Sequence, residues 1–205
     1  MHESSVIWGS AALDVHRVVV GPLANNVYVL RCRRTATAVL IDAADETERL
    51  LALADDLGVT DVLETHGHHD HVGAIPGLRD SGRTVWGHPD DEALFPALDR
   101  RLVHDQILEV GELRVRVIHT PGHTPGSTCF AVEGSPILFS GDTLFPGGPG
   151  ATTFEGGDFA TIIASIDQRL LGRFGDEVLV LPGHGAPTTV GVERPHLAEW
   201  VARGW

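Results

Sequence analysis

Short apolar runs, separated by glycine, proline and aspartate, recur along most of the chain. Runs of about four to eight residues rich in valine, isoleucine and leucine are typical of strands. We therefore predict strands, including a hairpin over 106–120, at residues 15–20, 27–31, 38–41, 59–64, 84–87, 106–120, 127–132, 136–140 and 177–181.

Other segments carry the helical period instead. Apolar side chains recur every three or four positions from Leu50 to Leu57, and Gly58 follows as a typical stop signal. Asp158 is a suitable N-cap for a later helix. Helices are predicted over 45–57, 72–78, 88–95, 159–173 and 195–202. Strands come first and then alternate with helices, twice over. This order predicts an α/β fold of two packed sheets with helices outside, as one domain over residues 1–205.

Composition narrows the class of partner. The formal net charge is −13, all fifteen basic residues are arginine, and none of them forms a long basic run, so nucleic acid is not expected to bind. No apolar stretch approaches the length of a membrane span, and the N-terminus lacks the basic start of a signal peptide. With only Cys32 and Cys129, which are predicted to be buried, a disulfide framework is not expected. We expect a cytoplasmic protein that acts on a small molecule, and no pattern indicates its oligomeric state.

The densest chemistry lies directly after the strand predicted at 59–64. The segment 65–71 reads Thr-His-Gly-His-His-Asp-His. His66 and His68 can point to one metal ion if the backbone stays extended, while Asp70 and His71 can reach a second. Imidazole and carboxylate together suit Zn²⁺, iron and Mn²⁺.

Three further candidates each follow an apolar strand and lie close to glycine. They are His123 in Thr-Pro-Gly-His-Thr-Pro-Gly, Asp142 in Ser-Gly-Asp-Thr, and His184 in Pro-Gly-His-Gly. Any one of these would be a weak signal, because a lone loop histidine is more often structural. The four segments together, in this order, indicate a metal centre.

From about Asn25 to Pro195 these segments resemble the metallo-β-lactamase superfamily, most closely its glyoxalase II-like branch. The resemblance implies an αββα sandwich and two divalent metal ions, zinc first, with iron or manganese as alternatives. It implies a first site of His66, His68 and His123, a second site of Asp70, His71 and His184, and Asp142 as the bridge. The expected reaction is hydrolysis of a thioester or related ester by a hydroxide between the metals, with Asp70 and Asp142 as the catalytic side chains. An aspartate at the bridge is more typical of thioester hydrolases than of true β-lactamases.

The loop after Asp142 departs from the pattern of these relatives. Short single-domain relatives usually carry a basic residue at its end, whereas here the end is Ala151. The helical extension with which glyoxalase II binds glutathione is also expected to be missing. An uncharged ester or another thiol is therefore favoured over a glutathione thioester.

Residues around the motifs have lesser predicted roles. His119 is a candidate outer partner of a ligand, His69 is predicted to face solvent, and Ser127 and Ser140 are predicted to be structural. Candidates to line the pocket, although packing is the commoner role for such side chains, are Trp8, Phe145 and Phe154.

The same candidate ligands are compatible with other functions. A persulfide dioxygenase would use one iron, expected at His66, His123 and Asp142. Phosphodiester hydrolysis is disfavoured because a basic patch is lacking. A non-catalytic zinc module is disfavoured too, because structural zinc usually has four closed ligands, whereas seven candidates leave room for water.

Overall fold

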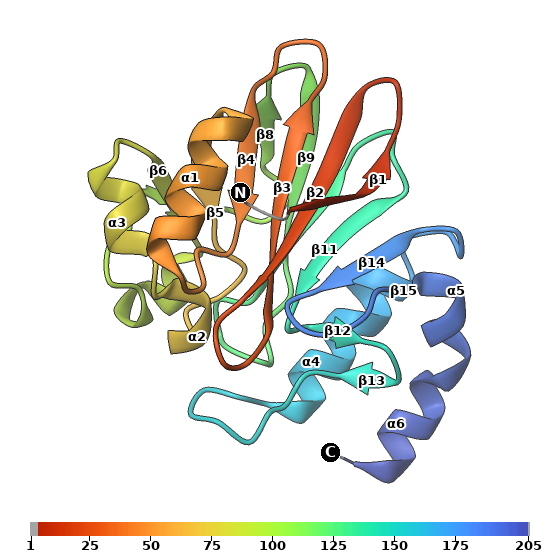
Figure 1. The fold of residues 1–205 in the computed structure, drawn as a ribbon. Coiled ribbons are helices and arrows are strands. Elements are labelled where there is room, and N and C mark those ends of the chain that lie inside the picture. The colour runs from red at the N-terminus through yellow and green to blue at the C-terminus, as the bar shows by residue number, and fades with distance from the viewer. Residues whose placement is uncertain (1–3, 205) are drawn as a thin grey trace.

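The computed structural model describes residues 4–204, and its longer strands form two sheets packed face to face (Figure 1). The first sheet holds, in chain order, β1 (Ser5–Gly9), β2 (Leu13–Val20), β3 (Asn25–Cys32), β4 (Ala38–Ile41), β5 (Val59–Leu63), β6 (Thr84–Gly87) and β7 (Arg100–Arg101). The second sheet has the order β15 (Thr188–Thr189), β14 (Leu179–Pro182), β11 (Ile137–Gly141), β10 (Thr128–Val132), β9 (Leu113–His119) and β8 (Ile107–Val110).

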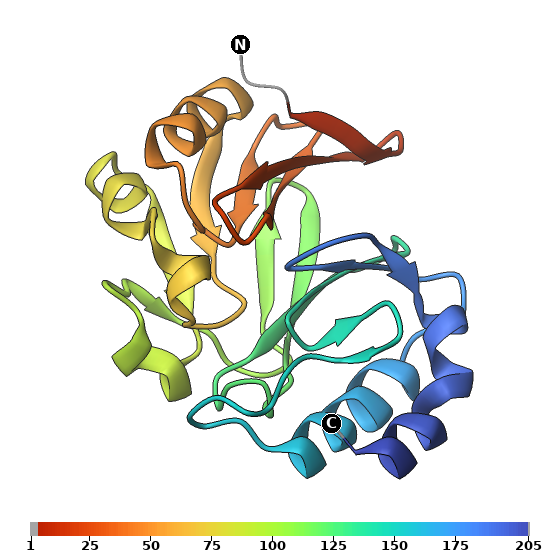
Figure 2. The same ribbon diagram turned by 60° about the horizontal axis from the view of Figure 1, so that its bottom comes forward.

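Helices cover the outer faces of both sheets (Figures 1 and 2). On the first sheet lie α1 (Thr47–Leu57) and α3 (Ile75–Asp80), and on the second lie α4 (Phe159–Ser165), α5 (Val190–Glu193) and α6 (Leu197–Arg203). The short helix α2 (His69–Val72) and the ribbon of β12 (Leu144–Phe145) and β13 (Gly148–Pro149) lie at one edge of the sandwich. Within residues 4–204, no helix is long and apolar enough to cross a membrane.

Alternation along the strands builds three apolar layers. In β4, Leu40 packs beneath α1 and α3, whereas Val39 and Ile41 face the space between the sheets. In β10, Phe130 enters that same central layer, while Cys129 joins the layer beneath α4 and α6. Successive strand side chains point to opposite faces, so a strand covered on both sides reads as a continuous apolar run. The predicted αββα sandwich is confirmed.

Two predicted helices differ from the structure. The helix expected at 72–78 is two short helices, α2 and α3, because the backbone between them turns away and the N–H of Ala74 donates to the carbonyl of Ala43 at 2.8 Å. The helix expected at 159–173 begins at the predicted cap, where the Asp158 side chain accepts from the N–H of Thr161, and then widens into a π-helical segment, Ile166–Leu171. The edge strand β1 was not predicted. A single domain over 1–205 stays a prediction.

Candidate metal centre

Five strands end at the same edge of the sandwich. β4 and β5 run parallel in the first sheet, and β11 and β14 run parallel in the second. β9 runs antiparallel to β10, which is itself antiparallel to β11, so the end of β9 reaches this edge as well. The loops that follow these strands therefore converge, and they carry every predicted ligand.

Three of the predicted residues form what we call the first cluster: His66, His68 and His123. One nitrogen from each lies within 4.8 Å of the others. The Nδ1 atom of His68 lies 2.9 Å from the Nε2 atom of His123, and the ring of His66 faces both rings edge-on at 4.8 Å between centroids. Two loops far apart in sequence thus place three imidazoles around one point.

The second cluster consists of Asp70, His71 and His184, again with ligand atoms within 4.8 Å of one another. The Nε2 atoms of His71 and His184 lie 3.2 Å apart. The Oδ2 atom of Asp70 lies 3.3 Å from Nε2 of His184 and 3.5 Å from Nε2 of His71. The helix α2 supplies the first two residues, and the loop after β14 supplies the third.

Asp142 lies between the clusters. Its carboxylate oxygens are 3.6 Å from the Nε2 atoms of His71, His123 and His184. Gly183 allows this approach, because a β-carbon there would lie 2.3 Å from Oδ1 of Asp142. The structure thus brings all seven predicted residues together, with Asp142 in the place expected of a bridge.

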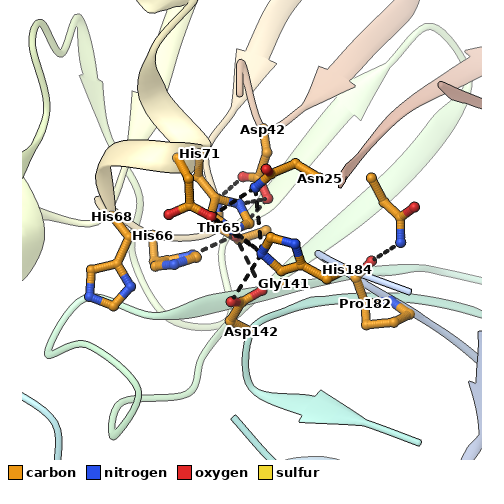
Figure 3. Close-up of polar contacts among 12 residues, drawn as sticks. Asn25, Asp42, Thr65, His66, His68, His71, Gly141, Asp142, Pro182 and His184 are labelled. Carbon is orange, nitrogen blue, oxygen red and sulfur yellow. Dashed lines mark hydrogen bonds and ion pairs between the residues drawn. The ribbon is translucent and has the colours of Figure 1, made fainter. Parts of the chain in front are cut away.

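Four of the five histidines are held in the same way; Figure 3 labels His66 and His71 with their partners Thr65 and Asp42. Each directs its Nδ1 to an oxygen atom outside the cluster: His66 to Oγ1 of Thr65, His71 to Oδ2 of Asp42, His123 to the carbonyl of Ala151, and His184 to the carbonyl of Leu23. This network assigns the proton to Nδ1 and leaves the Nε2 lone pair facing the centre. Metal-ligating histidines are oriented by outer partners of this kind.

Two atoms in the centre lack partners that a metal ion would supply. Among the described residues, neither Nε2 of His66 nor Oδ1 of Asp142 has a hydrogen-bond partner, although both are buried. Buried polar atoms are rarely left unsatisfied. The donor set of imidazole and carboxylate fits Zn²⁺, iron or Mn²⁺, so the residues present fit two divalent ions.

The two clusters differ in protonation. Burial, followed by the neighbouring imidazoles, lowers the pKa of His66 well below its usual value and that of His68 to about 4. Burial also lowers the pKa of His71, but the carboxylates of Asp142, Asp42 and Asp70 outweigh it and raise the pKa to about 9. The hydrogen bond to Asp70 raises the pKa of His184. Without metal, His66 and His68 are therefore neutral near pH 7, whereas His71 holds a proton.

Metal binding at the second cluster is therefore expected to release protons. Because an ion must displace the proton of His71, its affinity should rise from about pH 6 to about pH 8, approaching tenfold per pH unit for each proton displaced. Calorimetric titration in two buffers of different ionisation enthalpy measures the protons released, and release of none with the second ion would contradict this assignment.

Sequence reasoning missed two residues that hold the ligands. The carboxylate of Asp42, at the end of β4, accepts from Nδ1 of His71 at 3.0 Å and from Oγ1 of Thr65 at 2.8 Å. Asn25 donates from Nδ2 to Asp70 at 2.9 Å. The available signal for Asp42 was its place directly after a buried strand, the same place that identified the ligands.

A cavity of about 430 Å³ opens over the two clusters. Phe154 lines it and lies edge-on to His68, with ring centroids 5.5 Å apart. Leu23, in the loop between β2 and β3, lines the cavity too, and no arginine is among its described lining residues. The cavity therefore joins a polar floor to apolar walls.

The side chains predicted to line the pocket, to face solvent or to be structural differ in what they contact. Phe154 lines the cavity as predicted, whereas Trp8 packs into the layer between the sheets and Phe145 stacks on His184. His69 is exposed as predicted, and Ser127 and Ser140 are buried and hydrogen-bonded. His119 lies with Nε2 2.8 Å from the carbonyl of Pro125, in the loop that carries His123, and its ring stacks on that of His88.

Comparison with known proteins decides the family. A family model described as the metallo-beta-lactamase superfamily matches residues 20–184, a span that contains all seven predicted ligands. The chain belongs to the metallo-beta-lactamase superfamily. The resemblance seen in the sequence is thereby confirmed, and the protein is a metallo-beta-lactamase-fold chain of the metal-dependent hydrolase class.

Individual superfamily members are also similar. Hydroxyacylglutathione hydrolase GloC from Haemophilus influenzae is 36% identical over 179 residues, which are 77% of this chain and 84% of that protein. The solved structure of TTHA1623 in a di-iron-bound form is 35% identical, with a TM-score of 0.77 over 87% of this chain and 96% of that one. ETHE1 from Myxococcus xanthus is 29% identical, with a TM-score of 0.80 over 89% and 82% of the two chains.

Proposed function

We propose that this protein hydrolyses a thioester or a related ester with two divalent metal ions. The observation that carries the proposal is the arrangement of four histidines that turn Nε2 toward one centre on both sides of Asp142. The similarity to GloC, which is named as a hydroxyacylglutathione hydrolase, supports the thioester class. Zinc is the proposed metal, with iron or manganese as alternatives, and the di-iron form of TTHA1623 supports the iron alternative.

Each group of residues has a distinct task in this proposal. The first cluster would hold one ion, the second cluster the other, and Asp142 both. Two close divalent ions supply hydroxide near neutral pH and polarise a carbonyl group. Leu23 and Phe154 would exclude water on the side where the substrate enters and would bind its apolar part. No side chain is needed as a nucleophile.

A persulfide dioxygenase is the second candidate. The likeness to ETHE1 supports it, and His123 and Asp142 lie 3.6 Å apart, near His66, as a single iron would require. The two candidates differ in co-substrate, because only the dioxygenase consumes oxygen.

The test is a panel of acyl thioesters together with a persulfide, followed by thiol release and by an oxygen electrode. Thiol release from a thioester without oxygen uptake is expected. Oxygen uptake with the persulfide, and no release from any thioester, would replace the hydrolase proposal with the dioxygenase.

Ala151→Arg is expected to improve turnover of glutathione thioesters. Position 151 adjoins the first cluster, since its carbonyl lies 2.6 Å from Nδ1 of His123. A charge-assisted hydrogen bond to an anionic group is worth roughly 1.5–3 kcal/mol, or about ten- to a hundredfold in kcat/KM. The gain should appear in KM, because the arginine would contact the glutathione part of the substrate and not its reacting carbonyl group. Such a contact is equally strong in the ground state and the transition state.

Steady-state kinetics on one glutathione thioester and one uncharged thioester measure this effect. The wild type should prefer the uncharged substrate, and the substitution should help only the charged one. Efficient wild-type turnover of the glutathione substrate, or equal effects on both, would defeat the account of Ala151.

A further inference from the structure

Asp91 is a buried carboxylate that belongs to neither cluster. It lies in the 3-10 helix Pro89–Leu94, just after β6, and is only 1% exposed. Its carboxylate accepts three hydrogen bonds: from the N–H of Gly67 at 3.0 Å, from Oγ1 of Thr124 at 2.6 Å and from the N–H of Gly126 at 2.7 Å. Hydrogen bonds to an ionised acceptor are among the stronger ones in proteins.

These three donors come from the two loops that build the first cluster. Gly67 stands between His66 and His68, and Thr124 directly follows His123. A single side chain therefore ties both loops to the same helix. Asp91 is 24 positions from Gly67 in the sequence and 35 positions from Gly126.

Packing shows how closely the second loop is fitted to this carboxylate. A β-carbon on Gly126 would lie 2.6 Å from Cγ of Asp91 and 2.8 Å from its backbone nitrogen. Only glycine permits the loop to approach so near. Gly126, the second of the two glycines in the His123 segment, is thus explained by Asp91 rather than by the ligand itself.

We propose that Asp91 is a positioning residue that sets the spacing of His66 and His68 against His123, and so controls metal affinity at the first cluster alone. The inference rests on the proposed two-metal centre. The second cluster depends on other contacts: Asp42 holds His71, and the carbonyl of Leu23 holds His184. Disturbing Asp91 should therefore separate the two affinities.

Asp91→Asn tests this with little change in volume. The amide replaces one acceptor oxygen by a donor, which must face either the N–H of Gly126 or the donors of Gly67 and Thr124. Outer partners of metal ligands typically contribute about 10–100-fold in affinity. We expect a loss of that size for Co²⁺ at the first cluster and an unchanged affinity at the second.

The two affinities are measured separately by Co²⁺ absorption. A His184→Ala background leaves the first cluster intact, and a His123→Ala background leaves the second. Glu92→Gln is the matched control: it lies on the same 3-10 helix, is exposed, and its carboxylate pairs with Arg101 rather than with either cluster. It should bind Co²⁺ as the parent does in both backgrounds.

Thr124→Val provides an independent variant that preserves side-chain shape: it removes one of the three bonds to Asp91, together with the 2.8 Å contact between Oγ1 of Thr124 and Oγ of Ser127. It should weaken the first cluster in the same direction but less, and it decides the question if Asp91→Asn does not fold. Unchanged affinity at the first cluster, or equal losses at both, would overturn the role of Asp91. Failure of the proposed function is distinguishable, since the unsubstituted protein would then itself bind fewer than two ions.

Discussion

Asp142→Ala is expected to lower thioester hydrolysis by at least about a hundredfold while the chain stays folded. Even outer partners of metal ligands contribute about 10–100-fold to activity, and Asp142 itself lies 3.6 Å from ligand nitrogens of both clusters. Its loss would leave two cations without a shared anion. The substitution touches little of the apolar core, because this carboxylate lies on the floor of the cavity.

Steady-state kinetics measure the loss of hydrolysis, elemental analysis measures the metal content, and circular dichroism shows whether the variant stays folded. Asp56→Ala, at an exposed position of α1, is the control for loss of one carboxylate and should have wild-type activity. Near-normal turnover of Asp142→Ala with full metal content would show that the bridge is misassigned.

Asp42→Ala is expected to have the second largest effect, on metal binding and on stability together. Its carboxylate accepts from the N–H of Thr65 at 2.7 Å, from Oγ1 of Thr65 and from Nδ1 of His71, and it is buried. Removing this carboxylate removes the hydrogen bond that holds His71. It also frees the Thr65 hydroxyl, which holds His66. Activity should fall about 10–100-fold. Stranding these buried donors should cost roughly 1–3 kcal/mol of unfolding free energy.

Glu64 is a second buried carboxyl group that interacts with Asp42, and it bears on the stability expected of Asp42→Ala. Burial, and then the charge of Asp42, raise the pKa of Glu64 well above its usual range, so that it is neutral beside Asp42. Because a neutral Glu64 carries no charge for Asp42 to repel, removing Asp42 gains nothing there, and the stability loss is set by the hydrogen bonds that Asp42 accepts. Chemical denaturation with and without metal measures both effects. Unchanged stability and unchanged metal affinity would contradict the role given to Asp42.

The ligands could be predicted from the sequence because each follows an apolar strand directly. Parallel strands end at one edge of a sheet, so Asp142 and His184, after β11 and β14, had to approach one another once those strands were correct. His66 follows β5 of the other sheet and meets them because the two sheets pack face to face. The repeated use of histidine and aspartate at these ends then indicated a metal. Local pattern and spatial arrangement agree at this edge.

The residues that hold the ligands could not be predicted in the same way. Neither Asp42 nor Asp91 stands in a histidine-rich motif like that of residues 65–71, and their partners lie 23 to 35 residues away. Asp91 adjoins two other acidic residues in a segment that resembles an ordinary solvated turn. The carbonyls of Leu23 and Ala151 are invisible to sequence reasoning, because any residue offers one.

The break between α2 and α3 illustrates the same difficulty in the fold. The helical period from Val72 to Leu78 is locally continuous, but a backbone bond between Ala74 and Ala43 redirects the chain. Tertiary contacts of this kind override local propensity. The outcome matters for the site, because α2 ends just after His71.

The number of metal ions per chain tests the central claim most directly. Protein saturated with Zn²⁺, Mn²⁺ or Fe²⁺ and freed of unbound metal is submitted to elemental analysis. Two clusters that share Asp142 predict about two ions per chain. At most one ion per chain under saturation with each metal would contradict the two-metal centre and favour the single-iron dioxygenase.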